Sequence, residues 1–368
     1  MLMQSWIGGC EQLKGTGRLP QVEVITFLGY MKAVESRLLQ RLSAGGHLLR
    51  NLIRRRTPRE PVSPDPLKSS PPFTREDRTL PKGACRQETG REEESKPSRL
   101  PIVFIHYGNS DYLQHSLRQV KRTNPHSPLY LLGDESNDCY EEVIHHPFAD
   151  YAQEAEAFSR IYKHYNTTPF HYELFNFQRW FILQEFLHHN YLERCLYLDS
   201  DTLFYADASK EQKRFAPFDF TLSKKTSGCT FFLNRREALN NFCRFLTGIY
   251  TRRDRYAYDR MVAHFALRQK HRLEGGVCDM TAFGLYGELY FGHIGEVALI
   301  NDGSIYDPNI NTPDPGFAMH DGIKKVIWKQ GYPYGIHLKT GQEIRFNSLQ
   351  FQGRAKRLMP HFLQEPYA

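Results

Sequence analysis

The sequence lacks any long apolar segment. Its longest uncharged apolar run near the start is Val24 to Met31, between Glu23 and Lys32, whereas a membrane-spanning helix needs about 20 apolar residues. The run is also a poor secretory leader, because no charged start leads directly into it and no clear cleavage site follows. We therefore expect no transmembrane segment. Contact with a membrane, if there is any, would be peripheral.

Closely spaced cysteines are absent as well. The seven cysteines are scattered, with no Cys-x-x-Cys pair and no zinc-ligand spacing. Several lie in apolar runs, where a free Cys behaves as a small hydrophobic side chain. We therefore expect a reducing compartment and a cytoplasmic location.

The body of the chain has no excess of charge. Residues 1–99 contain 18 Lys and Arg against 11 Asp and Glu, so they account for the whole net charge of +7, and residues 100–368 contain the remaining 30 of each sign. A body without net charge has no bulk attraction to a polyanion, so we expect no nucleic-acid partner.

Three segments follow one another along the chain. Apolar residues recur at helical spacing over residues 21–53, so we interpret 1–57 as an uncertain helical extension. Residues 58–99 contain eight of the 21 prolines among Ser, Arg and Glu, which is typical of a disordered linker. Residues 1–99 can be an arm for a partner or a membrane surface, or a dispensable extension, and we favour the second interpretation.

Residues 100–368 begin with a strand–helix–strand pattern. The apolar run Ile102 to Ile105 predicts a buried strand, residues 111–122 a helix, and residues 129–132 a second strand. This pattern implies a parallel sheet, and ligands bind beyond the carboxyl ends of such strands. The loop with His106, Gly108 and Asn109 is therefore a candidate nucleotide contact, or an ordinary turn.

Two carboxylates follow a third predicted strand. A helix is predicted from about Tyr172 to His189 and carries Arg179; the apolar strand Cys195 to Leu198 comes next and ends at Asp199-Ser200-Asp201. Side chains at i and i+2 along a strand point to the same side. Carboxylates suit hard divalent ions such as Mn²⁺ or Mg²⁺, which also bind phosphate oxygens. The alternative is an Asp-rich turn that caps the next element.

The segment Arg194-Cys195-Leu196-Tyr197-Leu198-Asp199-Ser200-Asp201-Thr202-Leu203 resembles the Asp-x-Asp segment of GT-A nucleotide-sugar glycosyltransferases, especially the glycogenin-like and bacterial galactosyltransferase group. The resemblance implies one α/β, Rossmann-like GT-A domain over residues 100–368 with a mixed, mainly parallel sheet. It implies that Asp201 binds the metal and is catalytic, that Asp199 contacts the metal and the donor ribose, and that Arg179 lies near the donor.

Two further residues gain a role through the same resemblance. Gly228 begins a predicted strand that lines the sugar pocket in such enzymes, where glycine permits close approach of the ligand; it can equally mark a bulge in a core strand. Asp279 follows Gly275-Gly276. It is the candidate general base of an inverting reaction, or an N-cap for the helix from Met280 onward, and these two roles are compatible.

Near the C-terminus the spacing of Gln350, Gly353 and Lys356 matches the His-x-x-Gly-x-x-Lys motif of the glycogenin-like group. The resemblance implies that Gln350 stands at the position of the third metal ligand and that Gly353 and Lys356 bind the diphosphate. Glutamine is a weaker ligand than histidine, so His337 is an alternative third ligand. The other interpretation of the segment is a solvated amphipathic tail.

We therefore expect a hexosyltransferase that uses Mn²⁺ or Mg²⁺, a nucleoside-diphosphate sugar as donor and a glycan, lipid-linked or protein acceptor. One alternative is a haloacid-dehalogenase-like phosphatase, although Leu203 occupies the position where that class has Thr and no paired acidic motif follows a later apolar strand. The other is a non-catalytic GT-A-like protein that binds a sugar or a partner.

Overall fold

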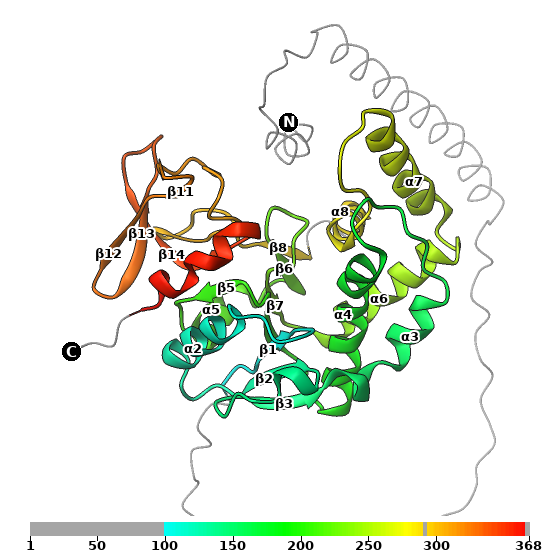
Figure 1. Cartoon of the computed structure of the whole chain (residues 1–368), viewed down its shortest axis with the longest axis horizontal. Coiled ribbons are helices and arrows are strands. Elements are labelled where there is room, and N and C mark those ends of the chain that lie inside the picture. The colour runs from blue at the N-terminus through cyan, green and yellow to red at the C-terminus, as the bar shows by residue number, and fades with distance from the viewer. Residues whose placement is uncertain (1–98, 290–292, 365–368) are drawn as a thin grey trace, which may run out of the picture. The chain divides into compact units, whose positions relative to one another are not determined.

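The computed structural model describes residues 99–289 and 293–364. The helix expected within residues 1–57 and all but the last residue of the expected linker lie outside these ranges. In the described part, the chain is a mixed α/β domain with a mainly parallel central sheet (Figure 1), which confirms the predicted fold class.

The central sheet has seven strands in the order β3-β2-β1-β4-β7-β6-β8. All neighbours pair in parallel except those of β7, which is antiparallel to both β4 and β6. The strands are β1 (Ile102–Ile105), β2 (Leu129–Gly133), β3 (Ile144–Pro147), β4 (Cys195–Leu198), β6 (Phe220–Leu222), β7 (Thr230–Leu233) and β8 (Ile294–Glu296). Because β1 is central and fully buried, both of its faces are apolar, which is why its sequence shows no alternation.

Helices cover both faces of this sheet (Figure 1). Val103 and Ile105 of β1 face one core, while Ile102 and Phe104 face the other. The first core is covered by α3 (Gln153–Ser159), α4 (Phe170–His189), α6 (Arg236–Tyr250), α7 (Arg255–Lys270) and α8 (Asp279–Leu289). The second is covered by α2 (Leu113–Thr123) and α5 (Ala208–Phe215). Two short 3₁₀ turns, η1 (Glu135–Asn137) and η2 (Phe148–Tyr151), flank β3.

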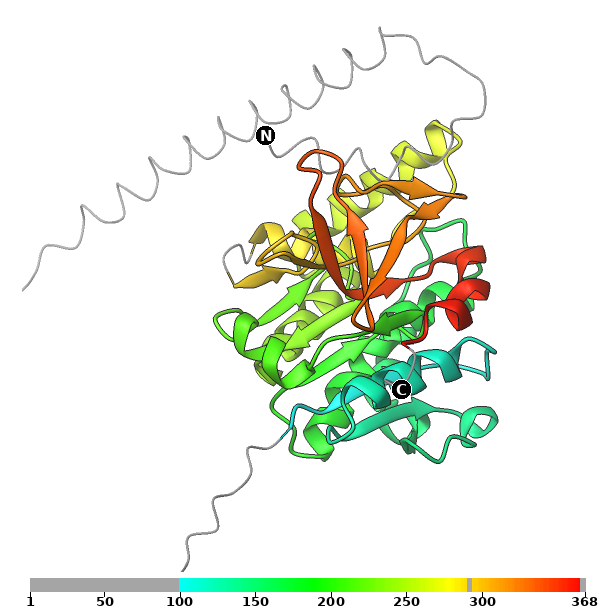
Figure 2. The ribbon, with the colours of Figure 1, turned by 90° about the vertical axis from the view of Figure 1, so that its left-hand side faces the viewer.

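A second, smaller sheet contains the C-terminal part of the chain. It runs β12-β13-β14-β5, with β9 beside β14, and packs a third core around Phe346. Its strands are β5 (Thr202–Phe204), β9 (Ser304–Tyr306), β12 (Val326–Lys329), β13 (Tyr332–Ile336) and β14 (Glu343–Gln350). The hairpin of β10 (Met319–His320) and β11 (Ile323–Lys324) lies between β9 and β12 in sequence, and the helical segment η3 (Gly353–Phe362) follows β14 (Figure 2).

The pairing of β14 with β5 connects the two sheets. Gln350 lies opposite Thr202, so the end of β14 comes directly beside the Asp-x-Asp segment that precedes β5. Nothing in the local sequence around Gln350 indicates this partner. No helix within the described ranges is long and apolar enough to cross a membrane.

Candidate functional site

The acidic pair lies at the edge of the sheet where β1, β2 and β4 all end. These strands are parallel, so their carboxyl ends meet, and Asp199 follows β4 directly. The N–H of Thr202 donates to the carbonyl of Asp199 at 3.0 Å, which closes a turn over residues 199–202. The two carboxylates therefore flank a turn, whereas the expectation that they point to the same side assumed extended backbone. They remain close enough for Asp199 to raise the pKa of Asp201.

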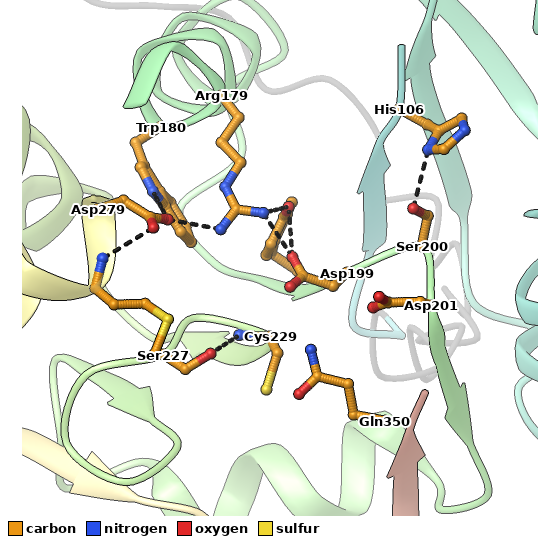
Figure 3. A network of polar contacts seen from close by, with 12 residues as sticks. His106, Arg179, Trp180, Asp199, Ser200, Asp201, Ser227, Cys229, Asp279 and Gln350 are labelled. Atoms are coloured by element: carbon orange, nitrogen blue, oxygen red, sulfur yellow. Dashed lines mark hydrogen bonds and ion pairs between the residues drawn. The ribbon is translucent and has the colours of Figure 1, made fainter. Parts of the chain in front are cut away.

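Arg179 on α4 fixes Asp199. One terminal nitrogen of Arg179 donates to Asp199 Oδ1 at 2.7 Å, and the Tyr197 hydroxyl donates to the same oxygen at 3.0 Å. Burial alone would lower the pKa of Arg179, but Asp199, Tyr197 and Asp279 raise it well above its usual range. Arg179 therefore lies beside Asp199, and its charge is neutralised by carboxylates of this chain (Figure 3). Its contact with a donor stays a prediction.

Asp279 lies on the other side of Arg179. Its Oδ2 accepts from Arg179 at 2.6 Å and from the indole N–H of Trp180 at 3.0 Å, while its Oδ1 accepts from the backbone N–H of Met280 at 2.8 Å. The last bond satisfies a free amide at the start of α8, in agreement with the capping interpretation. Asp279 is 3% exposed and already holds three donors, so its predicted role as a base stays a prediction.

Asp201 contacts the C-terminal segment. Lys356 Nζ lies 3.1 Å from Asp201 Oδ2, while Asp201 Oδ1 is buried without a hydrogen-bond partner. Burial and the carboxylate of Asp199 raise the pKa of Asp201 to about 6, against the lowering effects of Lys356 and Gln350. Lys356 also lies 4.5 Å from the centre of the Tyr112 ring. The Gln350–Gly353–Lys356 spacing thus brings Gln350 and Lys356 to the acidic pair.

His106 fastens the turn between the two carboxylates. Its Nδ1 lies 2.9 Å from the Ser200 hydroxyl and its Nε2 lies 3.1 Å from the Ser110 hydroxyl. The Ser116 hydroxyl donates to the Ser200 carbonyl at 2.7 Å. Burial and the charge of Lys356 lower the pKa of His106 to about 4, so its ring is neutral near pH 7. His106 supports the acidic turn; a contact with a nucleotide stays a prediction.

The rest of the β1–α2 loop is shaped by its neighbours. Gly108 has a φ of +77°, and its N–H donates to Asp134 Oδ2 at 2.6 Å. The side chain of Asn109 accepts from the Tyr140 hydroxyl at 2.7 Å. Tyr107, which precedes Gly108, is 70% exposed. The loop therefore lies at the predicted edge of the sheet, held there by a residue that follows β2.

Gly228 has a different neighbour from the one expected. A Cβ atom at Gly228 would lie 2.4 Å from the Trp180 ring, so glycine is needed there for the ring to pack. The structure thus gives this glycine a role in packing, and its contact with a sugar stays a prediction. Gly353 has a φ of +56° with no atom near its absent Cβ, so its backbone conformation alone favours glycine.

His337 does not reach the acidic pair. It follows β13 and pairs with Gln342, at the opposite end of β14 from Gln350. Eight residues of extended strand span about 27 Å at about 3.4 Å per residue. The alternative in which His337 replaces Gln350 as third ligand is therefore wrong, because strand pairing and not distance in sequence decides which residue meets the turn.

The acidic pair has the chemistry of a weak metal site. No cluster of three or more His, Cys, Asp or Glu side chains suited to a metal occurs in residues 99–289 or 293–364. Two carboxylates are at hand, and Asp201 Oδ1 is buried without a partner. The side-chain amide of Gln350 donates to Asp201, and its oxygen accepts from the Gln352 amide at 3.5 Å. Ions such as Mg²⁺ are typically bound by one or two carboxylates, with water and substrate phosphates completing the shell. The residues present fit that pattern.

The ionisable groups of the site carry a net negative charge when all are ionised. Asp199, Asp201 and Asp279 carry three negative charges when ionised, and Arg179 and Lys356 carry two positive ones. One negative charge remains, so the site favours a cation over a second anion unless a cation binds first.

Sequence reasoning missed several residues that build the site. The indole of Trp180 donates to Asp279, and the ring of Tyr112 lies beside Lys356. Ser200 bonds to His106, and Asp134 accepts from Gly108. Trp180 could have been found, because it adjoins Arg179 and a buried indole usually finds a hydrogen-bond acceptor. The sequence does not indicate the contact between Tyr112 and Lys356, since a residue directly before α2 has no pattern that distinguishes it from an ordinary helix start.

Comparisons with known proteins give matches in structure only. A scan against models of protein families finds no match, and a search of curated proteins finds none. Among solved structures, the chain is similar to the apo structure of WbbM, a bifunctional glycosyltransferase, at 11% identity and a TM-score of 0.32. The match covers 60% of this chain and 42% of WbbM, so the chain spans less than half of that protein.

A second solved structure, the PaToxG glycosyltransferase, matches at 13% identity and a TM-score of 0.29, over 53% of this chain and 71% of that one. Both proteins are described as glycosyltransferases. Because both TM-scores are low, we infer the function from this chain's own residues.

Proposed function

We propose that the chain is a glycosyltransferase that moves a hexosyl group from a nucleoside-diphosphate sugar to a glycan, lipid-linked or protein acceptor. One observation supports this most. The pairing of β14 with β5 brings Lys356 to 3.1 Å from Asp201, beside Asp199 and at the ligand-binding edge of a parallel sheet. A cation and two carboxylates in one place suit a diphosphate and its counter-ion.

A divalent ion such as Mn²⁺ or Mg²⁺ would neutralise charge on the leaving diphosphate when bound. Asp199 and Asp201 would hold it, with an amide oxygen from Gln350. Lys356 would bind a diphosphate oxygen, and Arg179 would keep Asp199 oriented. Because these groups are fixed before the donor binds, little reorganisation is needed.

Asp279 has a different place in this proposal. It anchors Arg179 and Trp180, and through Arg179 it orients Asp199. For an inverting transfer, Asp279 is the predicted base. Its Oδ1 accepts only from the N–H of Met280, so it keeps a lone pair that would accept a proton from an acceptor hydroxyl.

A thermal-shift screen of UDP- and GDP-sugars, with Mn²⁺ or with EDTA, tests the proposal. We expect a stabilising shift that requires Mn²⁺, is lost in Asp201→Asn and persists in Asp302→Asn, an exposed control. A shift that survives in Asp201→Asn contradicts the metal site. The absence of any shift with every nucleotide sugar contradicts the transferase.

The two alternatives give different results. A phosphatase would release phosphate from a phosphate ester and lose that activity in Asp199→Asn. A non-catalytic binder would show the shift without ever releasing a nucleoside diphosphate from the sugar.

A further inference from the structure

The smaller sheet buries an ion pair that the proposed chemistry does not use. Lys324 Nζ lies 2.7 Å from Asp307 Oδ1, and neither side chain has any exposed surface. Lys324 also donates to the Asn309 carbonyl at 2.6 Å. Burial raises the pKa of Asp307, and Lys324 together with the backbone amides of Asn309 and Gln350 opposes that rise. The pair therefore touches both the 307–311 loop and the end of β14.

This loop holds the segment that leads into the site. The N–H of Ile310 donates to the Gln350 carbonyl at 2.9 Å. The side chain of Asn309 donates to Gln352 Oε1 at 2.9 Å, and that of Asn311 donates to the Gln352 carbonyl at 2.9 Å. Residues 350–352 are thus bonded to the loop through both backbone and side chains.

The same segment is bonded to the acidic turn on its other side. The N–H of Phe351 donates to the Asp201 carbonyl at 2.9 Å. Gly353 then begins the 3₁₀ segment η3 with its positive φ, and Lys356 lies three residues further along it. Any displacement of residues 350–352 therefore displaces Gln350 and Lys356 relative to Asp201.

We propose that Asp307 and Lys324 are positioning residues for the diphosphate site, because their ion pair fixes the 307–311 loop against residues 350–352 and so sets where Gln350 and Lys356 meet Asp201. This inference rests on the proposed function. It gives the pair a role beyond stability, since a buried ion pair can often be replaced by apolar side chains without loss of stability. What apolar side chains cannot replace is the bond to the Asn309 carbonyl.

The test compares the wild type with the double variant Asp307→Leu/Lys324→Met, which replaces the two buried charges with apolar side chains. We expect hydrogen exchange at the amides of residues 350–352 to quicken in the ligand-free protein. We also expect affinity for UDP or GDP with Mn²⁺ to fall about tenfold, the size of one lost charged contact. In a Lys356→Ala background the double variant should cause a smaller further loss, because only the part of its effect that acts through Gln350 is left.

A second variant covers the case in which the double variant does not fold. Asn311→Ala removes only the bond to the Gln352 carbonyl, and Asn240→Ala, bonded to Glu237 on α6, is its control. We expect faster exchange at residues 350–352 and weaker nucleotide binding in Asn311→Ala alone.

Unchanged exchange and unchanged affinity in a folded variant would overturn the positioning role. So would a full, additive loss on top of Lys356→Ala. If the wild type binds neither nucleotide, the proposed function fails, while the exchange comparison still decides whether the pair holds residues 350–352.

Discussion

Arg179 bridges two carboxylates that come from different elements, Asp199 after β4 and Asp279 in α8. Its side chain is 15% exposed, and its Nε is buried without a partner. All of its bonding therefore goes through the two terminal nitrogens. A single guanidinium can bind two carboxylates in this way, whereas the ammonium of a lysine is a single point charge.

Replacing Arg179 with Met should lower the free energy of unfolding by about 3 kcal/mol, because the buried Asp279 and the partly buried Asp199 lose their cation. Arg179→Lys should lose less, since it keeps the charge but not the bridge. Urea denaturation measures both. Arg244→Met, at an ion pair that is mostly exposed, should change stability by less than about 1 kcal/mol. Equal losses in Arg179→Met and Arg244→Met would argue against the bridge.

His106 gives the acidic turn a dependence on pH. Its pKa of about 4 in the folded chain lies below the unfolded value of 6.5. Between these two pH values the unfolded state binds a proton at His106 and the folded state does not. The free energy of unfolding therefore falls as the pH drops from about 6.5 toward 4. Between pH 7.5 and pH 5 this residue should account for about 2 kcal/mol of lost stability.

Urea denaturation of His106→Gln at the two pH values checks this expectation. The variant should lose less stability than the wild type on acidification, by about that amount. His126→Gln, at an exposed position, should keep the wild-type dependence. A His106→Gln variant with the full wild-type dependence would show that His106 is not the group responsible.

At the scale of elements, the junction between β14 and η3 depends on Gly353. Its φ of +56° costs a residue with a Cβ about 1–2 kcal/mol, although no atom blocks the Cβ itself. Gly353→Ala should therefore destabilise the protein by about that much and weaken nucleotide binding, and Gly353→Asn should do so less, because Asn tolerates this conformation.

Gly248 is a matched control within α6, where its Cβ would also meet nothing. Gly248→Ala should stabilise the protein by about 0.5–1 kcal/mol, as measured by the same denaturation. If both alanine variants were stabilising, the positive φ at Gly353 would not be a constraint.

The elements that could be predicted from sequence are those with a local signature. The strands β1, β2 and β4 are short apolar runs because they are buried, and α4 was predicted to within two residues at its start. The pairing of β14 with β5 could not be predicted, because it joins segments far apart in sequence through backbone bonds that carry no side-chain pattern. That pairing decides that Gln350, and not His337, lies beside Asp201.

At the scale of the whole molecule, the described part of the chain combines an excess of acid at one edge of the sheet with a body that carries no net charge. Residues 100–368 are balanced in sign, so attraction for a donor must come from local groups. The position of the site, beyond the parallel strands, could be predicted from the sequence. Its internal pairing could not, because only tertiary packing pairs Arg179 with Asp199 and Asp279, and Lys356 with Asp201.

In the proposed function, the acidic pair and Lys356 serve transfer from a nucleotide sugar. The most direct measurement is release of nucleoside diphosphate from UDP- and GDP-sugars by the wild type, Asp201→Asn, Lys356→Ala and Asp302→Asn, each with Mn²⁺ and with EDTA. We predict release only with Mn²⁺, at similar rates in the wild type and Asp302→Asn, with a loss of at least about a hundredfold in Asp201→Asn and in Lys356→Ala. Release that persists in EDTA or in Asp201→Asn would show that transfer does not depend on a metal held by the acidic pair.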